Sequence, residues 1–159
     1  MSLSTDYYSG NSPMTVAGFE NAVNNSGGTS YGRINLLRAT AFSVNTVFAQ
    51  LNVQIGPENT EEAAVRAGIP EDTAGLNAFP SNVLGTASVR AVDLAQAYTT
   101  IAARGIRRDL HIIATIESAS GGSLYTAAPA TTQEFDTDVV DATTYAMQQV
   151  TEYGTAKKL

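Results

Sequence analysis

Cysteine is absent from this sequence of 159 residues, and histidine occurs only once, at His111. Without cysteine the chain has neither a disulfide framework nor thiol chemistry. A single histidine, with no cluster of acidic residues at ligand spacing, argues against a metal site, and we expect no cofactor. We interpret His111 as a surface strand residue, not as a metal ligand or a member of a Ser-His-Asp triad.

Charged residues are also scarce. They make up 15% of the chain against 43% for hydrophobic residues, which is a balance typical of a globular protein. The formal net charge is −6, and the nine cationic side chains are scattered, apart from Arg104, Arg107 and Arg108. Nucleic acid is therefore not an expected partner. No apolar run is long enough to span a membrane and no signal-peptide pattern is present, so we expect a soluble chain.

The length is typical of one domain that can bury a core. We interpret residues 1–3 as a remnant of an expression vector and residues 4–33, rich in Ser, Asn, Gly and Tyr, as a loop-rich N-terminal segment. Residues 34–159 are expected to form a mainly helical lobe. The composition does not change towards Leu159, which suggests that the chain is cut out of a longer protein.

Hydrophobic periodicity predicts five helices in the lobe, at about 34–42, 44–55, 59–67, 88–104 and 137–153. Ser88 is expected to cap the fourth helix, which ends near Gly105, and Thr137 to cap the fifth. Each of the last two helices is expected to have one apolar face. These faces are Ala91, Leu94, Ala95, Tyr98, Ile101 and Ala102 on the fourth helix, and Val139, Ala142, Ala146, Val150 and Tyr153 on the fifth.

One β-hairpin is predicted between the fourth and fifth helices. Residues Leu110 to Glu117 alternate apolar and polar side chains, Ser120-Gly121-Gly122 provides a turn, and Ser123 to Thr126 returns. The sequence thus predicts a mainly α fold with a single hairpin and no large sheet.

The run from Ala39 to Leu51 reads A-T-A-F-S-V-N-T-V-F-A-Q-L and sets a polar pair, Ser43 and Asn45, between two apolar helical segments. Residues two apart in one helix do not point the same way, so both side chains can face one cleft only if the chain breaks there. Two interpretations follow. Either Ser43 is the N-cap of the second helix and Asn45 is exposed in its first turn, or the pair belongs to an active site. On the tripeptide alone the cap is favoured.

Four blocks together resemble the transpeptidase domain of penicillin-binding proteins. The run above, with Ile55-Gly56, resembles the segment that carries the family's Ser-x-Asn motif. Leu84-Gly85 followed by V-D-L-A-Q-A-Y-T-T-I-A-A-R-G, then H-I-I-A-T-I-E-S-A-S-G-G-S-L, and the segment from Met147 to Ala156 agree with later blocks in order and spacing. The pattern is most similar to the bifunctional class that also carries a glycosyltransferase domain, in its actinobacterial form.

This resemblance implies serine acyl transfer between peptidoglycan stem peptides, inhibited by β-lactams. Ser43 would relay a proton to the leaving amine, and Asn45 would bind the peptide amide of the substrate or β-lactam. The family also has a Ser-x-x-Lys motif with the nucleophile and a Lys-Thr-Gly motif. Neither is present here, because the only lysines are Lys157 and Lys158. The chain therefore resembles the middle of such a domain, and alone it is expected to be inactive.

Two alternatives remain open at this stage: a helical interaction module in which Ser43 is a plain cap, and a penicillin-binding-like domain that has lost its chemistry. For the intact protein the resemblance implies a membrane anchor and a place on the outer face of the bacterial plasma membrane, with stem peptides and β-lactams as partners. The fragment is expected to expose apolar surface and to be able to self-associate.

Overall fold

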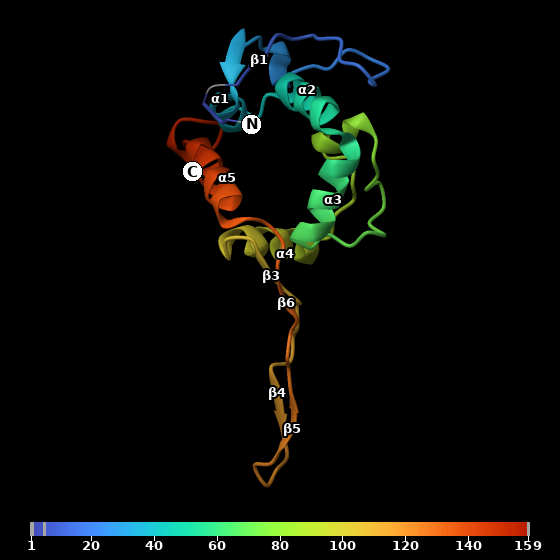
Figure 1. Cartoon of the computed structure of the whole chain (residues 1–159), viewed down its shortest axis with the longest axis vertical. Coiled ribbons are helices and arrows are strands. Elements are labelled where there is room, and N and C mark those ends of the chain that lie inside the picture. The colour runs from blue at the N-terminus through green and yellow to red at the C-terminus, as the bar shows by residue number, and fades with distance from the viewer. Residues whose placement is uncertain (1, 5, 159) are drawn as a thin grey trace.

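The helices form a ring, and a long, narrow finger of strands projects from it (Figure 1). The structure is a computed structural model that describes residues 2–4 and 6–158. Its elements are β1 (Tyr7–Ser9), η1 (Ser26–Gly28), β2 (Arg33–Asn35), α1 (Leu36–Ala41), α2 (Asn45–Ile55), α3 (Pro57–Ala67), η2 (Pro80–Leu84), α4 (Ala91–Ala102), β3 (Ile106–Arg108), β4 (Thr115–Glu117), β5 (Ser123–Thr126), β6 (Thr131–Gln133) and α5 (Thr137–Glu152).

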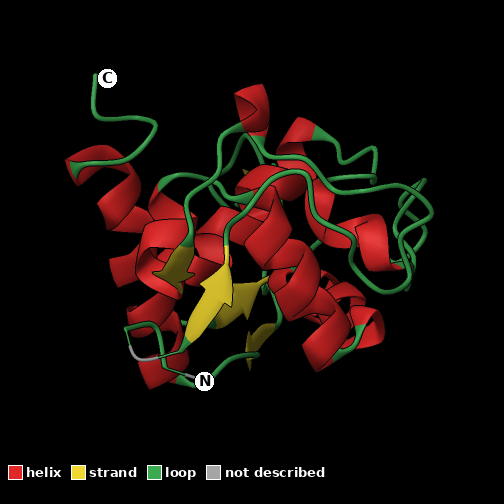
Figure 2. Ribbon diagram, turned by 90° about the horizontal axis from the view of Figure 1, so that it is seen from above, coloured by secondary structure: helices red, strands yellow, loops and turns green. Residues whose placement is uncertain are grey.

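The predicted fold class, mainly α with five α-helices, is confirmed. Helices dominate the molecule when it is seen from above (Figure 2). The strands form three two-stranded antiparallel sheets, β1–β2, β3–β6 and β4–β5. The first helix begins later than predicted, because Ile34 belongs to β2. The Asn35 side chain then accepts a hydrogen bond from the Arg38 amide, at 3.0 Å, and so caps α1.

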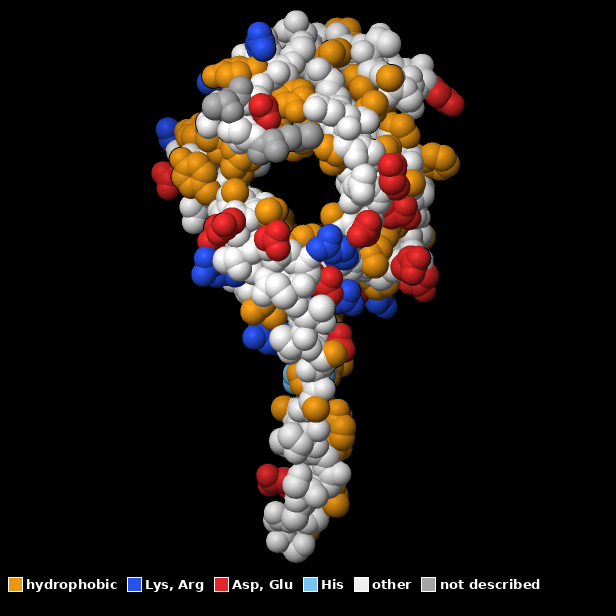
Figure 3. All heavy atoms as spheres, viewed as in Figure 1, with side chains coloured by type: hydrophobic (Ala, Val, Ile, Leu, Met, Phe, Trp, Pro, Cys, Tyr) orange, Lys and Arg blue, Asp and Glu red, His pale blue; other side chains and the backbone are white. Residues whose placement is uncertain are grey.

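The finger contains the predicted hairpin. Gly121, with φ at 86°, lies in the turn between β4 and β5, and β3 and β6 pair at the base of the finger. The prediction of a strand from Leu110 was wrong, since β4 begins only at Thr115. The apolar side chains of the segment before β4 are not covered by the rest of the chain, as the 97% exposure of Ile112 shows. Hydrophobic side chains are visible along the finger in Figure 3.

The core lies around α1 and α2. One cluster combines Ile34, Leu36, Ala39, Val44 and Val47, and a second combines Val16, Val23 and Ala49. Both clusters tie the N-terminal segment to these two helices. The break between α1 and α2 is therefore held by well-packed side chains on either side of it.

The predicted apolar stripes of α4 and α5 are only partly buried. On α4 the buried side chains are Asp93 and Thr100, whereas Tyr98, from the predicted apolar stripe, is 54% exposed. On α5 Ala146 is buried as predicted, together with Val140, but Val139 is 56% exposed. Both stripes are apolar as predicted, and a large part of each is exposed in this chain. Apolar faces of this kind indicate a surface that something else covers.

The ring closes where the end of α5 meets the end of α1. The Thr155 amide donates a hydrogen bond of 3.0 Å to the Ala41 carbonyl. A Cβ atom added to Gly154 would lie 2.1 Å from that carbonyl oxygen. Only glycine permits this approach of the two backbones.

We expect Gly154→Ala to destabilise the chain by about 1–3 kcal/mol, because the new methyl group forces α5 away from α1. Urea unfolding followed by circular dichroism measures this change. Gly122→Ala, in the turn of the finger, serves as the control, since its φ is not left-handed and its added Cβ would approach only the Ser118 hydroxyl, at 3.2 Å. Equal losses in the two variants would mean that crowding at Ala41 is not the cause.

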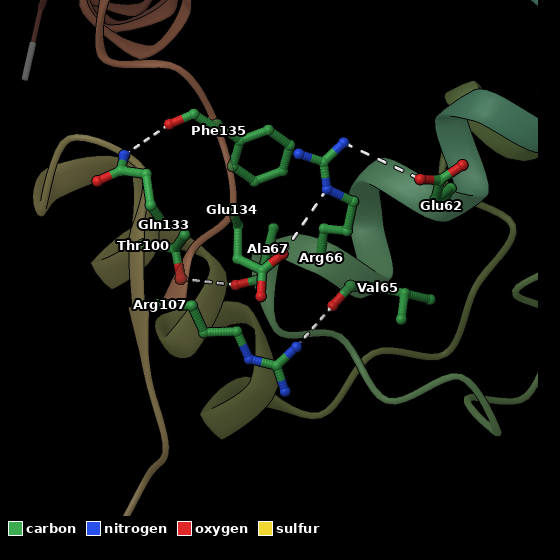
Figure 4. A network of polar contacts seen from close by, with 9 residues as sticks. All are labelled: Glu62, Val65, Arg66, Ala67, Thr100, Arg107, Gln133, Glu134 and Phe135. Atoms are coloured by element: carbon green, nitrogen blue, oxygen red, sulfur yellow. Dashed lines mark hydrogen bonds and ion pairs between the residues drawn. The ribbon is translucent and has the colours of Figure 1, made fainter. Parts of the chain in front are cut away.

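A second set of contacts joins the base of the finger to α3 (Figure 4). The Arg66 guanidinium lies over the Phe135 ring, 4.6 Å from its centroid, and its Nε is 3.7 Å from a Glu134 carboxylate oxygen. The Arg107 guanidinium donates to the Val65 carbonyl at 3.1 Å, and the Thr100 hydroxyl donates to the Ala67 carbonyl at 2.8 Å. These contacts fix the direction in which the finger leaves the ring.

An exposed ion pair joins the end of α4 to α5. Arg104 Nε donates to Asp141 Oδ1 at 2.9 Å, and a second guanidinium nitrogen contacts Oδ2. The hydrogen bond from Arg104 lowers the pKa of Asp141 below its ordinary value of 3.8. A lowered carboxyl pKa stabilises the folded chain above that ordinary value, and this contribution is lost as the pH falls through the lower folded value.

We therefore expect Asp141→Asn to lower the melting temperature near pH 6 and to change it little near pH 2. Because both partners are exposed, the effect is small and weakens in high salt. Melting curves of Asp141→Asn, Arg104→Gln and the double variant between pH 2 and pH 7 measure it. Strictly additive effects of the two substitutions at pH 6 would contradict a direct pairing.

Candidate active site

The predicted break between α1 and α2 is confirmed, and Ser43 lies within it. Its backbone is left-handed, with φ at 52°. The Ser43 amide donates to the Thr40 carbonyl at 3.1 Å, and the Val44 amide donates to the Ala39 carbonyl at 3.0 Å. These two bonds define a Schellman motif with Ser43 at the position after the C-cap, where glycine is the usual residue. Ser43 therefore ends α1.

The interpretation of Ser43 as the N-cap of the second helix was wrong. The N-cap residue of α2 is Val44, which has no side-chain cap. The missing cap comes from the loop-rich segment, because Asn25 Oδ1 accepts hydrogen bonds from the Thr46 amide at 3.0 Å and from the Thr46 hydroxyl at 3.2 Å. The start of α2 is thus satisfied without Ser43.

Asn25 is the residue at this site that sequence reasoning missed. It is only 5% exposed, and its amide nitrogen donates to the Gly10 and Thr29 carbonyls, each at 2.9 Å. The Asn25 side chain therefore fastens the N-terminal segment to the first turn of α2. Its partners are far away in the sequence, so the local pattern Asn24-Asn25-Ser26 indicated only a loop.

The Ser43 side chain is exposed, and its hydroxyl makes no hydrogen bond to any residue that the structure describes. A left-handed backbone costs a non-glycine residue about 1–2 kcal/mol. Such strain tends to persist where the side chain has a task. An exposed hydroxyl without a partner can both donate and accept a hydrogen bond.

Asn45 is the first residue of α2 and is half-buried. Its Nδ2 donates to the Asn24 carbonyl at 2.9 Å, which fixes the orientation of the amide. The Oδ1 atom and the second N–H group remain for another partner. Ser43 and Asn45 thus flank the same break, and each offers a positioned polar group.

Aromatic side chains support the break. Phe42 precedes Ser43, and its ring centroid lies 5.7 Å from that of Tyr31 and 6.1 Å from that of Tyr153. The Arg38 guanidinium lies over the Phe42 ring at 5.2 Å. Residues from the N-terminal segment, α1 and the end of α5 therefore converge behind Ser43.

The other predictions about functional groups concern His111 and membrane contact. His111 is exposed, as predicted, in the segment between β3 and β4 and not in a strand. Among residues 2–4 and 6–158 no group of three or more His, Cys, Asp or Glu side chains is arranged to hold a metal ion. In the same part of the chain, no helix has the length and hydrophobicity needed to cross a membrane.

Residues 4–158 match the family model of the penicillin-binding protein transpeptidase domain. This chain belongs to that family, and the resemblance seen in its sequence blocks is confirmed. Penicillin-binding protein 1A of Mycobacterium tuberculosis is 31% identical in an alignment 169 residues long that covers 96% of this chain. Penicillin-binding protein 1B of Escherichia coli is 29% identical over 128 residues, which span 80% of this chain.

Solved structures agree with these relatives. The penicillin-binding protein PonA1 from Mycobacterium tuberculosis superimposes on 96% of this chain with a TM-score of 0.83 and 30% identity. A structure of PonA1 in complex with penicillin V gives a TM-score of 0.80 and 31% identity over 92% of this chain.

The chain is much shorter than the proteins it matches. It spans 20% of the Mycobacterium tuberculosis relative, 15% of the Escherichia coli relative and 43% of the PonA1 structure.

Proposed function

We propose that this chain supplies the Ser-x-Asn wall of the active site of a peptidoglycan D,D-transpeptidase that also binds β-lactams. The observation that carries the proposal is Ser43 itself, in a strained left-handed conformation with an unengaged hydroxyl, beside the fixed amide of Asn45. Glycine is the usual residue at this position of a helix end, because it adopts the left-handed backbone without strain. Membership of the transpeptidase family gives the free hydroxyl its chemical context.

In the proposed reaction a serine from the Ser-x-x-Lys motif attacks the carbonyl of a D-Ala-D-Ala peptide bond. An ester to that serine forms and the terminal D-Ala leaves as an amine, which takes a proton through the Ser43 hydroxyl. The amine of a second stem peptide then attacks the ester, forms the cross-link and releases the serine. Asn45 holds the backbone amide of the bound peptide, so that the attacked carbonyl stays oriented towards the nucleophilic serine.

The motifs with the nucleophile and the Lys-Thr-Gly strand are not in these 159 residues. We place the rest of the domain against the ring. Figure 3 shows an opening through the middle of the ring, and α4 and α5 carry exposed apolar side chains such as Tyr98 and Val139. An apolar helix that carries the nucleophile and enters this opening would cover such surfaces. In its absence the isolated chain can self-associate through them.

The proposal is tested in the intact protein. A fluorescent penicillin should label the intact domain stoichiometrically, with the label on the serine of its Ser-x-x-Lys motif. The intact protein is proposed to be anchored in the plasma membrane with this domain outside. Absence of labelling from a domain that has all three motifs would contradict the proposal.

The second candidate is a penicillin-binding-like domain without catalysis. The sequence of the gene on either side of these residues separates the two candidates. If no Ser-x-x-Lys motif precedes the segment and no Lys-Thr-Gly follows it, the intact protein has no nucleophile, and the function must be one of binding.

A further inference from the structure

A cavity of about 660 Å³ lies between the N-terminal segment and the loop that contains η2. One wall is formed by residues 18–24 and the other by Phe79, Pro80, Ser81, Leu84 and Thr86. Its volume is within the range of small-molecule sites in proteins. The lining is largely apolar, with Phe79 66% and Leu84 39% exposed.

Buried amides hold the η2 wall in place. Asn52, which is 1% exposed, donates to the Pro80 carbonyl and to Asn82 Oδ1, each at 2.9 Å. Asn82 in turn donates to the Pro57 and Asn77 carbonyls at 2.9 Å. The loop is therefore fixed onto α2 and α3 before any ligand arrives.

The opposite wall is anchored at Val23. Met14 and Val23 form an isolated β-bridge, and Val23 is buried in the core. The two walls approach each other at one end, since a Cβ added to Gly18 would lie 2.7 Å from Pro80 Cγ. A cavity with two preformed walls can bind a ligand without the cost of ordering a loop.

The position of the cavity ties it to the Ser-x-Asn site. Asn24 lines the cavity, and the Asn24 carbonyl accepts the hydrogen bond from the Asn45 side chain. The cavity therefore lies beside the residue that positions Asn45. The one charged residue of the lining is Glu20, an exposed carboxylate.

We propose that this cavity binds the side chain of the stem peptide that carries a free primary amine on an alkyl chain. The alkyl part would lie on Phe79 and Leu84, and the ammonium would face the Glu20 carboxylate. An ammonium group gains from a carboxylate and from an aromatic face, and its alkyl stem gains from apolar cover. The proposal rests on the transpeptidase function, and it adds a specificity site to that function.

The test uses this chain and two peptides, Nα-acetyl-Lys-D-Ala-D-Ala with a free side-chain amine and its counterpart acetylated on that amine. Binding is followed by the amide shifts of the ¹⁵N-labelled chain. We expect saturable shifts at Asn21, Asn24 and Leu84 with the free amine, and at least threefold weaker binding of the acetylated peptide.

Variants assign the two parts of the site. Glu20→Gln should weaken binding of the free amine about threefold and leave the acetylated peptide unaffected. Phe79→Ala should weaken both peptides, by about fivefold or more. Glu117→Gln, on the finger, is the matched control and should change neither. Glu20 and Phe79 are exposed, so we expect both variants to fold. The dispersion of their amide spectra verifies this.

Equal affinities for the two peptides, or shifts that do not map to the cavity, would overturn the proposal. Penicillin labelling of the intact domain reports on the Ser-x-Asn site independently of this cavity. Labelling together with absent peptide binding would reject the cavity alone, whereas absent labelling would reject the transpeptidase function.

Discussion

Incubation of this chain with benzylpenicillin is expected to leave its intact mass unchanged. A β-lactam acylates an activated serine, and activation requires a base beside the hydroxyl. In the transpeptidase family that base is the lysine three residues after the nucleophile, and no serine of this sequence has a lysine at that spacing. The two lysines present, Lys157 and Lys158, follow α5 and the ring closure.

Ser43 is the serine at which we consider an adduct as the alternative, because its hydroxyl is exposed and unengaged and its backbone is left-handed. The nearest cation in sequence is the Arg38 guanidinium, which lies over the Phe42 ring and stays protonated at neutral pH. It cannot accept the proton of a hydroxyl. Mass spectrometry of the intact chain, beside a complete penicillin-binding protein as positive control, measures the outcome, and a stoichiometric mass increase would refute this account.

The second large effect is expected from substitution of Ser43. Glycine at this position should stabilise the fold, although loss of the hydroxyl should slow the chemistry of the intact domain. Glycine relieves the left-handed strain, so Ser43→Gly should raise the free energy of unfolding by about 1 kcal/mol or slightly less. Ser43→Ala keeps the strain and removes an unbonded hydroxyl, so it should change stability by less than about 0.5 kcal/mol. Urea unfolding of this chain measures both values.

Both substitutions remove the proposed proton relay, so each should slow penicillin acylation of the intact domain by roughly 10² to 10⁴-fold. Ser120→Ala at the tip of the finger removes an exposed hydroxyl elsewhere and should leave the rate unchanged. A loss of about 1 kcal/mol in Ser43→Ala, with acylation intact, would instead assign the hydroxyl a purely structural role.

The break between the first two helices could be predicted because it depends on local residues. Apolar positions on either side of Ser43 and Asn45 have helical spacing, and no single helix could present both polar side chains to one cleft. The nature of the break could not be predicted, since it depends on Asn25. That side chain caps α2 from a loop and leaves Ser43 free, and a contact of this kind has no local signature.

The apolar stripes on α4 and α5 show a different limit. Periodicity identifies the apolar face of a helix but does not say whether the residues that cover it belong to the same chain. Here Asp93 and Thr100 are the buried side chains of α4, while Leu94 and Tyr98 stay exposed. The finger is similar, because alternation correctly predicted a hairpin but could not show whether anything covers its apolar face.

The contact between Gly154 and Ala41 bears on the order in which this chain folds. The two residues are more than a hundred positions apart, so the backbone carbonyl at the end of α1 receives its partner only after nearly all of the segment has been synthesised. Local pairs such as α2 with α3 can form earlier, whereas closing the largest loop carries the largest entropic cost. During synthesis the ring is therefore an open arc, and Ser43 gains its aromatic support from Tyr153 last.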